Sequence, residues 1–235
     1  MRIALNAHLL TRLHSFRSAG VSRYIHGLVQ HLPLVDGRNE YLVYVNRTAG
    51  LEESRNVGAR VSRLPTIRPP VRILWEQAVQ PLALRRDGVD LVHAPVNVLP
   101  LSLPVPAVLT VHDLAFLRYP ERFSVGKRLY LTLMTRHSVR RARRIMADSA
   151  HTKADLVAML GVHPERIDVV YPGVEDDYRP PDPAALPAFR ERHGLPDRFA
   201  LFVGTLEPRK NLGRLIEAMA TVRGEIDCAL VVGGA

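Results

Sequence analysis

The sequence predicts an α/β fold, with one complete domain built on a parallel β-sheet and the start of a second domain of the same kind. Short apolar runs alternate with helix-length segments, the pattern of parallel strands joined by helical crossovers. A proline-rich segment, residues 179–183, interrupts this alternation, which restarts after it. The predicted parts are residues 1–172 for the first domain, 173–197 for a linker with a first helix, and 198–235 for the second domain.

The first part contains seven apolar runs that we predict to be strands, with helices between them. The strands are expected at residues 2–7, 41–45, 60–64, 90–94, 107–112, 145–148 and 167–171. The helices are expected at residues 21–32, 73–84, 125–141 and 152–160. Pro33 should end the first helix, and Pro81 should kink or shorten the second. Ser149 or Thr152 is the expected cap of the fourth helix, and Gly161 suits its C-terminal end.

The second part repeats the pattern over a shorter length. A helix is expected near residues 184–192, a strand at 199–203, a helix at 212–222 and a strand at 228–232. Two strands cannot bury both faces of a parallel sheet. We therefore expect the sequence to be cut short inside its second domain.

Charge is distributed unevenly between the two parts. Residues 1–172 contain 24 Lys and Arg against 13 Asp and Glu, a net charge of +11, whereas residues 173–235 contain 8 against 10, a net of −2. The basic part indicates an anionic partner, such as a phosphorylated ligand, an acidic membrane surface or nucleic acid, or simply a surface rich in arginine. A cluster at the end of the helix at residues 125–141 either complements the helix dipole or contacts an anionic membrane. The cluster comprises Arg136, Arg140, Arg141, Arg143 and Arg144.

Several classes of protein are disfavoured. The single cysteine, Cys228, allows no internal disulfide, so a cytoplasmic location is expected. Residues 91–112 carry no Asp, Glu, Lys or Arg, but four prolines interrupt them, which favours two strands and a loop over a membrane helix. The sequence contains no Gly-x-Gly-x-x-Gly, which disfavours a nicotinamide-binding domain. It has no Asp-x-Asp and no cysteine pair, so no metal site is expected.

Three places suit a ligand site. Gly20 opens a predicted helix, where backbone N–H groups can approach a phosphate, although an ordinary turn glycine is the alternative. His112 and Asp113 close a buried strand at the edge where α/β sheets bind ligands, or else cap the following loop. Arg209 and Lys210 precede a helix and suit a diphosphate, or else form a solvated basic pair.

Taken together, five segments resemble glycosyltransferase family 4, the retaining GT-B enzymes, in the order in which that family has them. They are Gly20-Val21-Ser22-Arg23-Tyr24, Val111-His112-Asp113-Leu114-Ala115-Phe116, Ala147-Asp148-Ser149-Ala150-His151-Thr152-Lys153, Val169-Val170-Tyr171-Pro172-Gly173-Val174, and Gly204-Thr205-Leu206-Glu207-Pro208-Arg209-Lys210-Asn211-Leu212. The resemblance implies two facing Rossmann-like domains, with the acceptor mostly on the first and a nucleotide-sugar on the second.

The resemblance also implies roles for individual residues. His112 is the implied catalytic residue facing the transferred sugar, and Gly20, Arg209 and Lys210 are implied to bind the donor diphosphate. Tyr24, Asp113 and Ser149 are implied on the acceptor or sugar side. No metal ion and no cofactor besides the donor substrate are implied, and GDP-mannose is the first candidate donor.

The implied function is metal-independent transfer of a hexose, with retention, to a saccharide or lipid-linked acceptor in cell-surface polysaccharide or glycolipid synthesis. The implied location is the cytoplasm, with peripheral contact at the inner membrane face and no nucleic-acid partner. The family's glutamate pair would lie beyond Ala235, because Glu217 and Glu225 have its spacing but not its place. Residues 1–235 alone are therefore expected to be inactive. The alternative is a non-catalytic basic module that binds anionic lipid or polymer.

Overall fold

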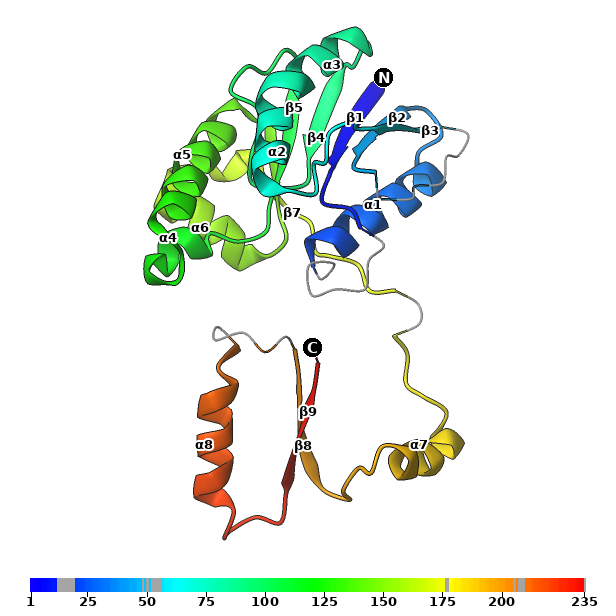
Figure 1. Cartoon of the computed structure of the whole chain (residues 1–235), viewed down its shortest axis with the longest axis vertical. Helices are drawn as coiled ribbons and strands as arrows, with labels where there is room; N and C mark the ends of the chain where they lie inside the picture. Colours follow the sequence, from blue (N-terminus) through cyan, green and yellow to red (C-terminus); the bar gives the residue numbers. More distant parts are fainter. Residues whose placement is uncertain are drawn as a thin grey trace. The chain divides into compact units, whose positions relative to one another are not determined.

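The computed structural model describes residues 1–11, 20–47, 49, 51, 56–175, 178–204, 206 and 210–234. They fall into two compact units, Met1–Gly173 and Val174–Ala235, and each unit is described by itself (Figure 1). Both units are α/β with parallel strands, which confirms the predicted fold class.

The first unit is built on a seven-stranded parallel sheet in the order β3-β2-β1-β4-β5-β6-β7. The strands are β1 Arg2–Ala7, β2 Glu40–Val45, β3 Val57–Val61, β4 Leu91–Ala94, β5 Ala107–Val111, β6 Arg144–Ala147 and β7 Ile167–Val169. Because all the strands are parallel, their carboxyl ends share one edge of the sheet, and the loops that follow them meet there. The predicted strand–loop–strand arrangement of residues 91–112 is confirmed.

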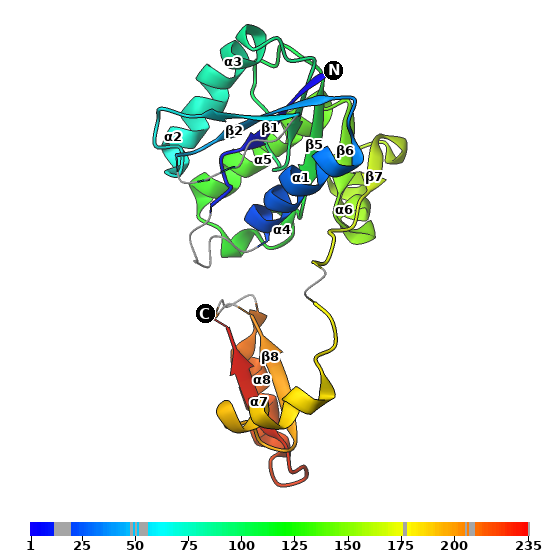
Figure 2. The ribbon, with the colours of Figure 1, turned by 90° about the vertical axis from the view of Figure 1, so that its right-hand side faces the viewer.

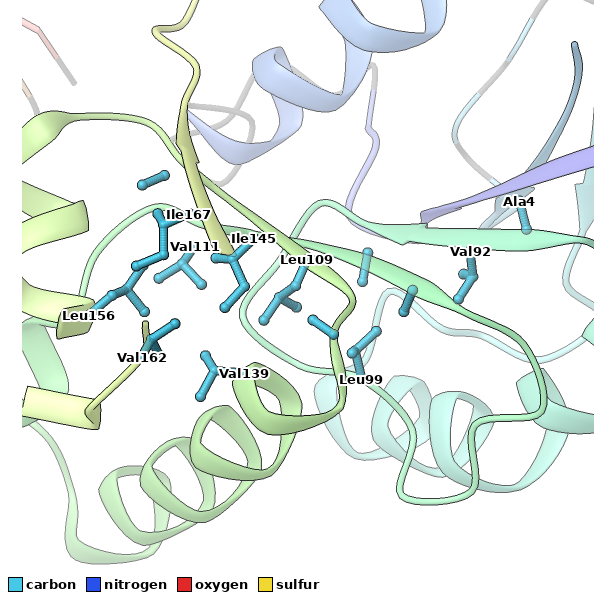
Figure 3. Close-up of a cluster of buried hydrophobic side chains, with 14 of the residues drawn as sticks. Ala4, Val92, Leu99, Leu109, Val111, Val139, Ile145, Leu156, Val162 and Ile167 are labelled. Atoms are coloured by element: carbon cyan, nitrogen blue, oxygen red, sulfur yellow. The ribbon is translucent and has the colours of Figure 1, made fainter. Parts of the chain in front are cut away.

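Helices cover both faces of this sheet. They are α1 Val21–Val35, α2 Pro69–Leu74, the π-helical segment η2 Trp75–Val79, α3 Gln80–Arg86, α4 Ala115–Arg118, α5 Val125–Arg141 and α6 Ala150–Leu160, with short 3-10 turns η3 Pro120–Arg122 and η4 Pro164–Arg166. Ile25 and Val29 of α1 pack with Leu5 and Val43 on one face. The larger core lies on the other face, where side chains from α5 and α6 meet the inward residues of β4, β5 and β6 (Figure 3). Leu84 of α3 belongs to the same core.

Three local expectations need correction. The helix α1 continues past Pro33 to Val35, because a proline near the end of a helix removes only one backbone bond and Asp36 N–H still bonds Leu32 O. The strand β3 lies at residues 57–61 and not at 60–64, because Val57 is buried while Leu64 is exposed. Pro81 is accommodated by a π-helical turn without ending the helical run.

The cap of α6 is as predicted. The Ser149 hydroxyl accepts a hydrogen bond from Thr152 N–H at 3.0 Å, and Gly161 ends the helix in a left-handed conformation with φ +64°. No helix among the described residues has the length and hydropathy of a membrane span.

The second unit contains two parallel strands, β8 Phe199–Val203 and β9 Ala229–Gly233, joined through α8 Leu212–Val222 (Figure 2). A 3-10 turn, η5 Pro183–Ala185, and α7 Leu186–Arg192 precede them. None of the residues described in this unit is buried. Cys228, expected inside the last strand, lies just before β9 and is only partly buried.

Candidate functional site

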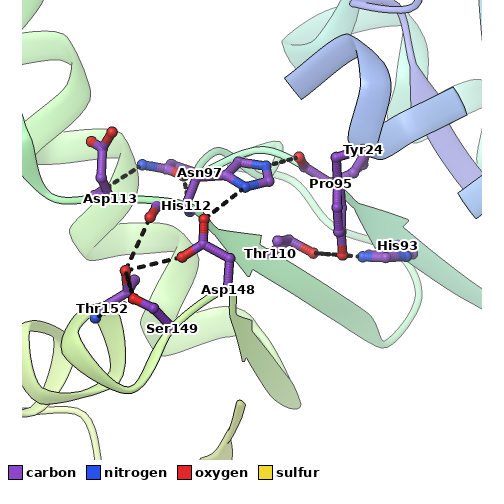
Figure 4. Close-up of polar contacts among 10 residues, drawn as sticks. All are labelled: Tyr24, His93, Pro95, Asn97, Thr110, His112, Asp113, Asp148, Ser149 and Thr152. Carbon is purple, nitrogen blue, oxygen red and sulfur yellow. Dashed lines mark hydrogen bonds and ion pairs between the residues drawn. The ribbon is translucent and has the colours of Figure 1, made fainter. Parts of the chain in front are cut away.

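His112 is the first residue after β5, and two neighbouring segments fix its backbone. Its N–H points to Asn97 Oδ1 at 3.4 Å, and its carbonyl oxygen accepts from the Thr152 hydroxyl at 3.0 Å. Asn97 belongs to the loop between β4 and β5, and Thr152 to the first turn of α6 (Figure 4). The residue is therefore held where the loops after three adjacent strands meet, at the carboxyl edge of the sheet.

The imidazole ring of His112 has a protein oxygen at each nitrogen. Nε2 lies 3.0 Å from Pro95 O, and Nδ1 lies 3.5 Å from Asp148 Oδ2. Both oxygens can only accept. A neutral ring carries one N–H and can donate to one of them, whereas a doubly protonated ring donates to both. Asp148 Oδ1 lies 3.1 Å from the same Thr152 hydroxyl, which can share its one proton between this oxygen and His112 O, so the carboxylate is held from the α6 side (Figure 4).

A second polar chain runs beside His112 on the same face of the sheet. The ring of Tyr24, from α1, meets the His112 ring edge to face at 5.0 Å between centroids. The Tyr24 hydroxyl lies 3.2 Å from Thr110 Oγ1, which is 2.8 Å from His93 Nε2 (Figure 4). Burial raises the pKa of Tyr24. Burial and, second, the charge of His112 lower the pKa of His93 to about 4, so at neutral pH His93 is uncharged.

Gly20 lies at the same edge, directly before α1. Its φ of +64° is in the left-handed region that favours glycine, and a Cβ there would meet nothing within 4 Å. No side chain caps the first turn of α1, whose N–H groups are suited to an anion. Through α1, the structure brings Gly20 and Tyr24 to the same end of the sheet as His112.

The two polar side chains expected on the sugar or acceptor side have local partners. Asp113 Oδ1 accepts from Ala115 N–H at 3.1 Å, which stabilises the start of α4. The Ser149 hydroxyl caps α6 and lies 3.0 Å from Thr152 Oγ1. Asp113 is exposed, and Ser149 is partly buried. Both side chains therefore stabilise the start of a helix, whether or not they also contact a ligand.

The basic pair of the second part is described only in part. Arg209 lies outside the described residues, while Lys210 is exposed in the second unit. The next residue, Asn211, begins α8 with φ +57°. Among the described residues, no group of three or more His, Cys, Asp or Glu side chains is placed to hold a metal ion.

Sequence reasoning missed Asp148, Asn97 and His93 as members of this cluster. The signal was available for two of them, because Asp148 follows the buried strand β6 just as His112 follows β5, and His93 lies near the end of β4. Parallel strands bring such residues together at one edge. Asn97 lies inside a proline-rich loop whose path has no sequence signature.

Comparison with known proteins identifies relatives of this chain. The Escherichia coli O-antigen chain mannosyltransferase B is 26% identical over 216 residues, covering 89% of this chain and 53% of that protein. A D-inositol 3-phosphate glycosyltransferase of Streptomyces scabiei is 38% identical over 90 residues, which cover 37% of this chain and 20% of that protein. The chain thus spans about half the length of the first of these relatives and less of the second.

Solved structures share the fold. The glycosyltransferase WaaG, involved in lipopolysaccharide biosynthesis, superposes with a TM-score of 0.63 at 19% identity, over 98% of this chain and 62% of WaaG. Anabaena HepE in complex with UDP and glucose gives a TM-score of 0.62 at 19% identity, over 99% of this chain and 61% of HepE. Residues 18–178 match Glycosyltransferase Family 4, which is more than half of the sequence. The chain belongs to glycosyltransferase family 4.

Proposed function

We propose that this chain is part of a glycosyltransferase that moves a hexose from a nucleoside-diphosphate sugar to a saccharide or lipid-linked acceptor, with retention at the anomeric carbon. The observation that carries the proposal is the cluster of Tyr24, His112 and Asp148 at the carboxyl edge of the sheet, in a chain of this family. In this proposal unit 1 takes the acceptor and unit 2 takes the nucleotide-sugar.

The residues have distinct roles in the proposed reaction. His112 faces the transferred sugar, and Asp148 keeps its ring oriented. The first turn of α1 at Gly20, together with Arg209 and Lys210, stabilises the negative charge that grows on the diphosphate as its bond to the sugar breaks. No metal ion or cofactor is included in the proposal.

Mannose is the first candidate sugar. The name of the Escherichia coli relative, a mannosyltransferase, supports mannose as the sugar, and GDP-mannose is the first candidate donor. HepE has been solved with UDP and glucose, which makes UDP-glucose the competing donor. Because these proteins share at most 26% identity with this chain, the two donors are to be distinguished by a transfer assay.

The test uses the full-length protein with each donor and an acceptor panel. His112→Ala is expected to lower kcat by about 100-fold or more, the usual scale for a residue at the reacting atoms, with little change in Tm. His151→Ala is the matched control, since His151 is a mostly exposed histidine on α6. A His112→Ala protein with normal turnover and a lowered Tm contradicts the proposal. Product anomers measured by NMR test retention.

A membrane surface is the proposed partner of α5. Val125, Leu129 and Leu133 are spaced by four residues and expose 73%, 56% and 56% of their surface. Arg136 and Arg140 are exposed and continue this stripe along the helix. An apolar stripe beside arginines suits a bilayer that contains anionic lipid.

Part of the basic cluster expected from the sequence has other partners. Arg144 forms two hydrogen bonds with the Asp168 carboxylate at 3.0 and 2.5 Å, and Arg141 reaches Leu103 O at 3.4 Å. These contacts hold β6 to β7 and α5 to the loop before β5. The proposed membrane contact therefore rests on Arg136 and Arg140, beside the apolar stripe.

A further inference from the structure

Two buried polar side chains, Thr110 of β5 and His93 of β4, lie on the face of the sheet that α1 covers. Thr110 stands between Leu109 and Val111, which both belong to the larger core on the other face. Since side chains alternate along a strand, Thr110 points toward α1, and the same alternation in β4 directs His93 there. Thr110 is 1% exposed and His93 6% exposed. A hydroxyl and an imidazole at this depth need hydrogen-bond partners.

These two residues form a chain of hydrogen bonds with Tyr24. His93 Nε2 lies 2.8 Å from Thr110 Oγ1, which lies 3.2 Å from the Tyr24 hydroxyl (Figure 4). Burial keeps His93 uncharged at neutral pH, so its Nε2 either donates to Thr110 or accepts from it, according to the tautomer. If Nε2 donates, the Thr110 hydroxyl donates to Tyr24, and if Nε2 accepts, Tyr24 donates to Thr110. Both tautomers complete the chain, so the Tyr24 hydroxyl has a partner in either case.

Tyr24 connects this chain to His112. It is the fourth residue of α1 and closes the first turn, with its N–H bonded to Gly20 O at 2.9 Å. Its ring meets the His112 ring at 5.0 Å between centroids and 83° between planes. The helix has a separate anchor, because Ile25 and Val29 are buried against the sheet. Loss of the hydroxyl bond should therefore free the Tyr24 side chain without moving α1.

The orientation of the His112 ring depends on this contact. At its nitrogens the ring has one hydrogen bond of ordinary length, 3.0 Å to Pro95 O, and one longer contact of 3.5 Å to Asp148. A ring held in this way can still tilt. The nearly perpendicular ring of Tyr24 limits the tilt, and it can do so only while its own hydroxyl is held.

We propose that His93 and Thr110 are positioning residues for the transfer reaction, because they hold the Tyr24 ring against His112 and so fix the direction in which the imidazole faces the sugar. Both act through Tyr24 and neither is proposed to touch a substrate. This inference rests on the proposed function, since it names residues that orient its catalytic histidine. A misplacement of about 1 Å near the reacting atoms can cost about 100-fold in rate.

The test breaks the chain at each of its members in the full-length protein. Thr110→Val keeps the shape of the side chain without its hydroxyl, and Tyr24→Phe removes the other partner of the same bond. Each is expected to lower kcat about tenfold and to leave the donor KM within about twofold, because α1 stays in place. His93→Leu should lower kcat less, by about threefold, since Thr110 still bonds Tyr24.

Two further variants separate positioning from a general loss of packing. Thr110→Ser restores the hydroxyl and should return kcat to within about threefold of the unaltered protein. The double variant Thr110→Val with Tyr24→Phe should lose no more than either single variant, since both remove the same bond.

The NMR signal of His112 Cε1–H reports the position of the ring without any turnover. It is assigned among the ten histidines by its loss in His112→Ala. The signal should shift in the same direction in Thr110→Val and in Tyr24→Phe, because both release the neighbouring aromatic ring, and it should return in Thr110→Ser.

Thr66→Val is the matched control. Thr66 Oγ1 lies 2.9 Å from Nδ1 of the buried His8, a threonine–histidine pair of the same kind in unit 1, and the His8 ring packs against Trp75. This variant should lower Tm as Thr110→Val does, but it should leave kcat and the His112 signal unchanged.

An unmoved His112 signal in folded Thr110→Val and Tyr24→Phe overturns the inference, whatever the activity. A double variant that loses the product of the two single losses also overturns it, as does a Thr66→Val protein that shifts the signal equally. Normal kcat in Thr110→Val, beside a His112→Ala protein that has lost turnover, overturns this inference and leaves the proposed function intact. If the signal moves but the unaltered protein uses neither donor, His93 and Thr110 still position His112 and the transferase proposal fails.

Discussion

The two units of the chain follow the same local pattern of strand, helix and strand, yet they differ in what they bury. In unit 1, Leu109, Ile145 and Leu156 are 0% exposed, and helices cover both faces of seven strands. In unit 2, two strands pair in register from Phe199 to Val203, and no described residue is buried. Leu201 and Val203 leave 60% and 72% of their surface exposed.

This difference teaches that burial depends on neighbours and not on local sequence. The strand at 199–203 and the helix at 212–222 form as the sequence predicts, and both are as regular as their counterparts in unit 1. A parallel strand becomes buried only when it has further strands beside it and helices on both of its faces. Stability should therefore be concentrated in unit 1.

Each unit carries its own probe for testing this comparison. Trp75 is the only tryptophan and is buried in unit 1, so its fluorescence reports that unit. Cys228 is the only cysteine and lies in unit 2, so the rate of thiol labelling reports that one.

The largest expected effect is on the core. Leu109→Ala in β5 should lower the free energy of unfolding of unit 1 by about 2–5 kcal/mol, because it leaves a cavity in a closely packed core. Leu201→Ala in β8 should change the free energy of unfolding of unit 2 by less than about 0.5 kcal/mol. Urea unfolding followed by Trp75 fluorescence and Cys228 labelling measures both. Equal losses in the two variants would break the comparison.

Acid should destabilise unit 1 through its buried histidines. Burial lowers the pKa of His8 and of His93 to about 4, against 6.5 when unfolded. The unfolded chain binds more protons between these values, so stability falls as the pH drops from about 6.5 to 4, by on the order of 2–3 kcal/mol per histidine. His193 is an exposed histidine of unit 2.

The Tm of the Trp75 transition, measured from pH 7 to pH 4, tests this expectation. His93→Asn should flatten the dependence of Tm on pH even though it lowers Tm at pH 7. His193→Asn is the matched control and should leave the curve unchanged. If the plot of Tm against pH for His93→Asn runs parallel to that of the unaltered protein, protonation of His93 is not the cause of the acid destabilisation.

Substitutions in the two units should also differ in their effect on membrane binding. Leu129→Ser combined with Leu133→Ser should weaken binding to vesicles containing phosphatidylglycerol by about 30-fold or more, since each leucine contributes about 1 kcal/mol or more of apolar burial. Leu201→Ser, an equally exposed leucine of unit 2, should have no effect. Sedimentation at low and high salt gives the measurement. Binding to neutral vesicles that equals binding to anionic ones would count against the membrane proposal.

The smallest expected effect concerns helix caps. Ser149→Ala removes the side-chain cap of α6 and should cost unit 1 about 1 kcal/mol. Asn211 begins α8 in a left-handed conformation without a side-chain cap bond, so Asn211→Gly should cost nothing or stabilise by a few tenths of a kcal/mol. Thermal melts of the two variants decide. A larger loss for Asn211→Gly would show that this residue has a partner in solution.

Most of the fold could be predicted because its strands and helices have strong periodic patterns. The predicted ends of helices were less accurate where the helix contains a proline. The helix α1 passes through Pro33, since near a helix end only one bond is lost. At Pro81, a π turn preserves the helical run, and no sequence rule selects that solution over a kink.

The candidate site could be predicted in part. His112 was predicted from the sequence because it follows a buried strand, and the structure places it at the carboxyl edge of the sheet, while its role stays a prediction. Away from this site, the burial of Glu76 was not predicted, because a glutamate in a helical segment suggests a solvated side chain. Glu76 lies in the π-helical segment Trp75–Val79, which has no sequence signature, and it is 5% exposed. Contacts such as Asp148 with His112 join residues 36 positions apart and depend on the order of strands in the sheet.

The central place of β1 sets the order in which the protein can assemble on the ribosome. This strand is made before both of its neighbours, β2 on one side and β4 on the other. Its second neighbour, Leu91–Ala94, is synthesised about 85 residues later, which at 5–20 residues per second is a wait of about 4–17 s. During that interval the apolar edge of the nascent strand is open to other chains. Protection of the nascent chain should therefore matter most in the interval between the synthesis of β1 and that of β4.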